Sequence, residues 1–175
     1  ELGIFAAMAY VAIVGARVVN ALGTSAVPRL AKLHLQGDAA RYKRLLLQTA
    51  AVGALIGAGA TLLAAFAGRE ILTFLYKPEY AERLDAFVWL MAAAGFGYVG
   101  IFLECGMTAA RRFWSQPLII TAAAAALAIG AVILIPAHGL TGVAMAMTAS
   151  SLVQLACRAW IVFRVVRELE EGARA

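Results

Sequence analysis

The sequence predicts an all-α membrane protein, a polytopic bundle of five transmembrane helices. Apolar residues make up 63% of the 175 residues and charged residues only 14%, against roughly 45–50% and about 25% in soluble domains. The mean hydropathy is +0.85. Apolar runs with at most one charge also recur along the chain, and each is long enough to cross a bilayer. These observations exclude a soluble or disordered chain.

Five spans follow from the positions of the charged residues, at about 2–22, 45–68, 86–110, 116–136 and 139–163. The first and third each carry one charge, Arg17 and Glu104, and the second carries none. The last two come from one long uncharged run, Phe113 to Cys157. We divide this run at residues 136–139, because proline ends a helix and glycine permits a tight turn.

The basic residues predict the orientation. Eleven of the 15 lysines and arginines lie in segment 23–44, at residues 111–112 and toward the C-terminus, and three lie in segment 69–85. The positive-inside rule then places 23–44 and the tail 164–175 in the cytoplasm, and 69–85 outside. We therefore expect a multi-pass protein of the cytoplasmic membrane with a cytoplasmic C-terminus.

Two connecting segments contain apolar residues and are predicted to be structural. Segment 23–44 is a basic connection that either lies on the headgroups or extends the first span. Within it, Gly37 breaks the helix and Asp38 caps the next one. Segment 69–85 is predicted to form a short extracytoplasmic element at the membrane interface.

Charged residues inside spans are costly and usually face a bundle interior or a wet cavity. Arg17 shares a helical stripe with Tyr10, Asn20 and Thr24. It either binds a phosphate or carboxylate in the bilayer, or snorkels to headgroups or pairs structurally. Glu104 is expected at a similar depth, so an ion pair with Arg17 is predicted, either static or formed in one conformation.

The last span carries polar residues on one face: Thr148, Ser151, Gln154 and Arg158. Hydroxyls and amides commonly join helices in lipid, and Arg158 is close enough to the cytoplasmic end to be a topology charge. Gln154 is retained as a candidate cavity residue.

No catalytic, metal or cofactor site is predicted, and we expect no enzyme. The G-x-G-x-x-G at 95–100 lies within a span and, like Gly53 and Gly57, indicates close helix packing. The cysteines and histidines are isolated, at Cys105, Cys157, His34 and His138. The basic residues form no single stripe, which argues against nucleic acid.

Three stretches resemble the C-terminal half of bacterial polysaccharide flippases, in the superfamily that also contains multidrug and toxin extruders. They are LGIFAA at 2–7 followed by PRLAKL at 28–33 and GD at 37–38, LYKPEYA at 75–81, and LIPAHGLTGVAMA at 134–146. His138 stands where the family often has an aromatic residue. The chain starts at Glu1 without a methionine, and we expect it to be part of a longer protein.

The resemblance implies helices eight to twelve of a two-lobe exporter in the bacterial inner membrane, working by alternating access. Its substrate would be a polyprenyl-pyrophosphate-linked oligosaccharide for O-antigen, capsule or exopolysaccharide. Its partners would be membrane lipids, the missing N-terminal lobe and polysaccharide polymerase or ligase machinery. The resemblance implies that Arg17 is the cation of the substrate cavity. Three further cavity residues are proposed from the helical faces on which they lie: Asn20, Glu104 and Gln154. The alternatives are a multidrug or toxin extruder, a non-transporting scaffold and, third, a membrane-embedded transferase.

Overall fold

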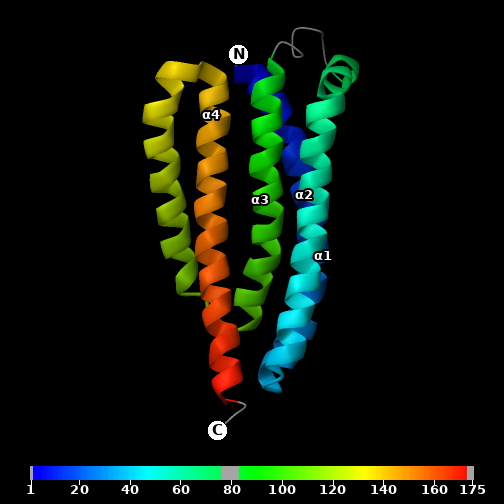
Figure 1. The fold of residues 1–175 in the computed structure, drawn as a ribbon, viewed down its shortest axis with the longest axis vertical. Helices are drawn as coiled ribbons and strands as arrows, with labels where there is room; N and C mark the ends of the chain where they lie inside the picture. Colours follow the sequence, from blue (N-terminus) through cyan, green and yellow to red (C-terminus); the bar gives the residue numbers. More distant parts are fainter. Residues whose placement is uncertain (1, 76–82, 173–175) are drawn as a thin grey trace.

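The computed structural model describes residues 2–75 and 83–172, and these fold into a bundle of long helices (Figure 1). The helices are α1 (Leu2–Leu35), α2 (Ala39–Leu75), α3 (Leu84–Ala109) and α4 (Ser115–Gly172). Each contains a stretch long and apolar enough to cross a membrane. The all-helical class predicted from the sequence is confirmed for the described residues.

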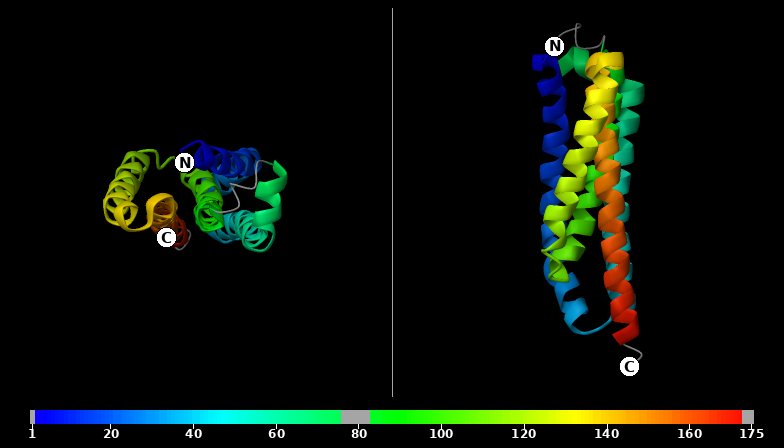
Figure 2. Two further views of the ribbon diagram at one scale, coloured as in Figure 1. Left: turned by 90° about the horizontal axis from the view of Figure 1, so that it is seen from above. Right: turned by 90° about the vertical axis from the view of Figure 1, so that its left-hand side faces the viewer.

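The helix α4 is folded back on itself at Gly139, which has φ 55° and ψ −125°. Its two halves lie side by side and antiparallel (Figures 1 and 2). Across them, the Ser150 hydroxyl donates a 2.8 Å hydrogen bond to the Ala123 carbonyl. The reversal falls inside the predicted turn at 136–139. Among residues 2–75 and 83–172 the structure thus has four helices where the sequence predicts five spans, and α4 contains the residues of the last two spans.

Replacing Gly139 with alanine is expected to destabilise this reversal. The backbone angles of Gly139 lie in a region that L-residues rarely adopt, and such strain costs about 1–3 kcal/mol. The thermal unfolding temperature of the purified protein should therefore fall for Gly139→Ala and stay close to wild type for the neighbouring His138→Ala. Equal unfolding temperatures for the two variants would show that the reversal tolerates a side chain.

At the opposite end of the bundle, α1 continues beyond the predicted end of the first span. It ends at Leu35, and Gly37 follows with φ 68°. The backbone N–H of Arg41 donates a 3.0 Å hydrogen bond to the Asp38 carboxylate. The predicted break and N-cap are confirmed, and segment 23–44 extends two membrane-type helices. It forms no separate surface helix.

The helix α3 lies at the centre of the bundle and contacts all three other helices. Half of the residues in its most apolar stretch are buried, against 11–17% in the other helices. Small residues allow the closest approach, because a Cβ on Gly57 would lie 2.5 Å from the Gly95 Cα. Gly53 is packed in the same way against the Phe102 ring. Gly53, Gly57 and Gly95 therefore serve helix packing, as predicted for these segments, whereas a Cβ on Gly97 would meet nothing within 4 Å.

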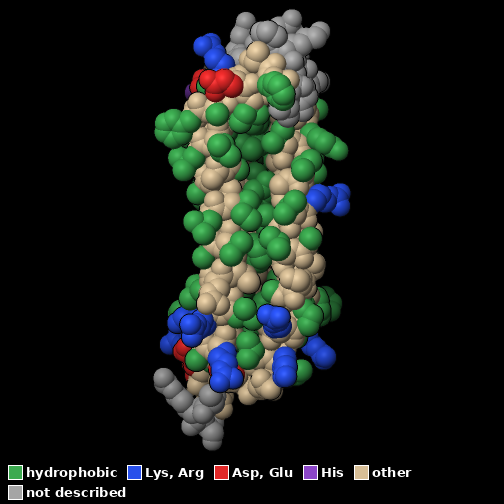
Figure 3. All heavy atoms as spheres, turned by 90° about the vertical axis from the view of Figure 1, so that its right-hand side faces the viewer, with side chains coloured by type: hydrophobic (Ala, Val, Ile, Leu, Met, Phe, Trp, Pro, Cys, Tyr) green, Lys and Arg blue, Asp and Glu red, His purple; other side chains and the backbone are tan. Residues whose placement is uncertain are grey.

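Charged side chains are unevenly distributed along the bundle. On the face shown in Figure 3, most lysine and arginine side chains gather at the end where the C-terminus lies. In segment 69–85, residues 69–75 continue α2, whereas 76–82 lie outside the described residues. Residues 173–175 of the tail also lie outside them.

Candidate functional site

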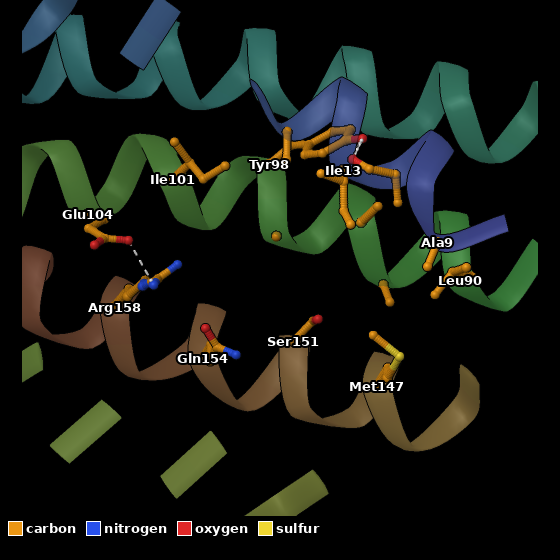
Figure 4. A pocket seen from close by; sticks show the side chains of 15 residues that line it. Ala9, Ile13, Leu90, Tyr98, Ile101, Glu104, Met147, Ser151, Gln154 and Arg158 are labelled. Atoms are coloured by element: carbon orange, nitrogen blue, oxygen red, sulfur yellow. Dashed lines mark hydrogen bonds and ion pairs between the residues drawn. The ribbon is translucent and has the colours of Figure 1, made fainter. Parts of the chain in front are cut away.

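A groove with a volume of about 420 Å³ opens between α1, α3 and α4 (Figure 4). Most of its wall is apolar. The helix α1 contributes small residues and Ile13, α3 contributes Leu90, Tyr98 and Ile101, and α4 contributes Met147. The polar lining side chains other than Tyr98 are Glu104, Ser151, Gln154 and Arg158. The groove therefore combines a long apolar wall with a charged end.

At the charged end, Arg158 of α4 forms an ion pair with Glu104 of α3. The distance between Nη2 of Arg158 and Oε2 of Glu104 is 2.8 Å. The Arg158 side chain is 14% exposed and that of Glu104 is 40% exposed. Pairing reduces the cost of holding two charges among apolar helices.

The predicted partner of Glu104 is wrong, because Glu104 pairs with Arg158 and not with Arg17. Arg17 is exposed on α1 and makes no hydrogen bond or ion pair with any residue in the described ranges. Its neighbour Ala16 faces the groove. Successive residues of a helix point about 100° apart, so the guanidinium leaves α1 in a different direction.

Glycine makes room for the arginine. A Cβ on Gly100 of α3 would lie 2.7 Å from Nη1 of Arg158, so the guanidinium packs directly on the backbone of α3. Ser151 and Gln154 precede Arg158 at helical spacing and project from α4 toward α3 in Figure 4. The three side chains thus form one polar strip along the groove.

The structure brings two of the four predicted site residues together. Glu104 and Gln154 line the groove. Arg17 and Asn20 are exposed on α1 and do not line it. Asn20 lies one turn beyond Ala16 on the same helical face, toward the charged end, whereas Arg17 lies beside that face.

Sequence reasoning missed Arg158 as a groove residue, because its closeness to the basic C-terminal end explained it as a topology charge. One signal was present, since Arg158 follows Gln154 by four residues on the same face. Of that face, Thr148 does join helices as predicted: its hydroxyl donates a 3.0 Å hydrogen bond to the Trp89 carbonyl. The polar face of α4 therefore joins helices at Thr148 and lines the groove from Ser151 to Arg158.

No family model matches the chain, and no solved structure matches it. It is similar to the capsular polysaccharide biosynthesis protein CapF of Staphylococcus aureus, with 29% identity over 154 residues. The match covers 88% of the chain and 39% of CapF. The chain therefore spans about two fifths of the length of this relative, and it is a multi-helix membrane-type segment similar to part of a protein named for capsule biosynthesis.

Proposed function

We propose that this chain forms part of an inner-membrane flippase for a polyprenyl-pyrophosphate-linked oligosaccharide used in cell-surface polysaccharide synthesis. The observation that carries the proposal is the groove, which places an arginine at the end of a long apolar wall within membrane-type helices. The similarity to a capsular polysaccharide biosynthesis protein supports the polysaccharide context.

The substrate chemistry matches the two parts of the groove. An arginine guanidinium presents a planar fork of N–H donors that suits phosphate oxygens. The amide of Gln154 and the hydroxyl of Ser151 are hydrogen-bonding groups suited to a sugar or phosphate. The apolar wall would accept the start of the prenyl chain, and the remainder would stay in lipid.

The same proposal includes five membrane crossings. The helix α4 reverses at Gly139, so each of its halves would cross once, beside one crossing each by α1, α2 and α3. The positive-inside rule would place the basic end, and with it the C-terminus, in the cytoplasm. The chain would then supply part of one lobe of a two-lobe exporter, and alternating access would require both lobes.

Two other functions make different predictions. The cationic substrates of a multidrug or toxin extruder would be repelled by an arginine in the binding groove, whereas an anionic lipid would be attracted. In a non-transporting scaffold, Arg17 and Arg158 would affect stability or assembly and leave flux unchanged.

The test compares surface polysaccharide in bacteria that lack their own copy of the complete gene. Cells would carry the wild type, Arg17→Ala or Arg17→Lys at matched membrane levels. The wild type should restore surface polysaccharide. If the exposed Arg17 faces a hydrated cavity and contacts the headgroup, Arg17→Ala should reduce the amount of surface polysaccharide. Arg17→Lys should give an intermediate amount. Full restoration by all three proteins would keep the flippase and exclude Arg17, which does not line the groove, as a contact of the headgroup. Accumulation of a lipid-linked intermediate without the gene product would identify flipping as the missing step, and its absence would contradict the proposal.

A further inference from the structure

Arg158 is the cation best placed in the groove to bind an anion, and a carboxylate already occupies it. Its Nη2 atom lies 2.8 Å from Oε2 of Glu104. Carboxylate and phosphate oxygens bind the same guanidinium donors. A phosphate that enters the groove must therefore share these donors with Glu104 or replace it.

The two partners of the pair differ in their freedom to move. The Arg158 side chain is only 14% exposed and packs against Gly100, where even a Cβ would come within 2.7 Å of Nη1. The Glu104 side chain is 40% exposed. Packing thus holds the guanidinium in place, whereas the carboxylate has an open side toward which it can turn.

Glu104 stabilises the charge of Arg158 when no anionic ligand is bound. An unpaired guanidinium among apolar helices is costly, and a nearby carboxylate lowers this cost. When an anionic ligand arrives, it can take over the neutralisation of Arg158. The exchange keeps the arginine paired throughout, and the ligand binds with an affinity reduced by the competition.

We propose that Glu104 is an internal competitor at this site: it holds Arg158 when the groove is empty, and the phosphate group of an anionic lipid displaces it. The identity of that lipid as a polyprenyl pyrophosphate rests on the proposed function. A competitor inside the site also assists release, because the carboxylate can return to Arg158 as the ligand leaves. A carrier requires this property, since a ligand that is held too tightly does not leave.

The test measures the binding of undecaprenyl pyrophosphate to the protein expressed from its complete gene and reconstituted in nanodiscs. Glu104→Gln should bind about tenfold more tightly than the wild type, because Arg158 is then free of its competitor. Arg158→Met should bind at least roughly tenfold more weakly. The double variant should gain much less than tenfold over Arg158→Met, because without the arginine Glu104 acts on the anion only through charge repulsion.

A matched control separates competition from overall charge. Glu171 forms an exposed pair with Arg167, with a distance of 3.5 Å between Oε1 and Nε. Glu171→Gln removes the same charge away from the groove and should leave the affinity unchanged. Glu104→Asp keeps the charge but shortens the reach, so tighter binding by this variant provides a second test that does not depend on the folding of Glu104→Gln.

Three results would overturn the competitor role. The first is unchanged or weaker binding by both Glu104 variants. The second is that Glu104→Gln tightens binding by the same factor in Arg158→Met as in the wild type. The third is that no variant binds any of the probes. Phosphatidylglycerol and inorganic pyrophosphate serve as further probes. If phosphatidylglycerol alone reproduces the pattern, Glu104 remains the competitor and the substrate named under the proposed function is wrong.

Discussion

Arg158→Met is expected to reduce surface polysaccharide at least roughly tenfold in the complementation assay, because the groove loses the guanidinium that would bind the anionic headgroup. It should also lower the stability of the purified protein, by about 1–3 kcal/mol, since Glu104 is left without its partner between α3 and α4. This loss of stability is smaller than that expected for a fully buried pair, because the Glu104 side chain is 40% exposed. Thermal unfolding and quantified surface polysaccharide measure the two effects separately.

The double variant Glu104→Gln/Arg158→Met distinguishes binding from structure. Removing both charges should restore most of the stability, because neither charge is then left unpaired. It should not restore surface polysaccharide. Recovery of both quantities together would contradict the binding role of Arg158 and leave the pair with a structural role.

Gly57→Val is expected to disrupt the packing of α2 against α3. A Cβ at this position would lie 2.5 Å from the Cα of Gly95 and 3.0 Å from its carbonyl oxygen. These are backbone atoms, so no side chain can rotate away, and the two helices must separate. Overpacking of this kind costs about 1–3 kcal/mol or more, and close packing is the main attraction between helices in lipid. The variant should show a lower unfolding temperature and a smaller folded, monodisperse fraction in detergent.

Gly59→Val is the matched control for this prediction. Gly59 lies two residues further along α2, and a Cβ there would meet nothing within 4 Å. The variant makes the same change in volume and helix propensity without the backbone contact. If Gly57→Val behaves like Gly59→Val, the close contact between α2 and α3 is not needed for folding.

The sequence allowed the helical segments to be predicted because of a physical constraint on chains in lipid. A backbone crossing hydrocarbon must satisfy its own hydrogen bonds, and long apolar runs therefore form helices. The chain reversal was predictable from Pro136 and Gly139, and the start of α2 from Asp38, since these residues act on the local backbone. The continuation of α1 to Leu35 was one of two alternatives left open, because hydropathy marks where a helix leaves lipid and not where the helix itself ends.

The site was only partly predictable. Glu104 and Gln154 were identified from polar residues inside apolar spans, and both line the groove. The partner of Glu104 was assigned wrongly because depth along the helices was the only criterion, and both Arg17 and Arg158 satisfied it. Depth follows from counting residues, whereas the direction in which each side chain points depends on how every helix is rotated.

The sequence by itself determined that this chain is an apolar, all-helical protein with a basic end, because composition, charge position and local breaks act without tertiary contacts. Only the tertiary structure decided which helix faces meet. The contact between Gly57 and Gly95 fixes how α2 sits on α3, and the space above Gly100 admits Arg158 beside Glu104. Helix rotation in a bundle is set by the packing of small and large side chains on several helices at once, and no single segment carries that information.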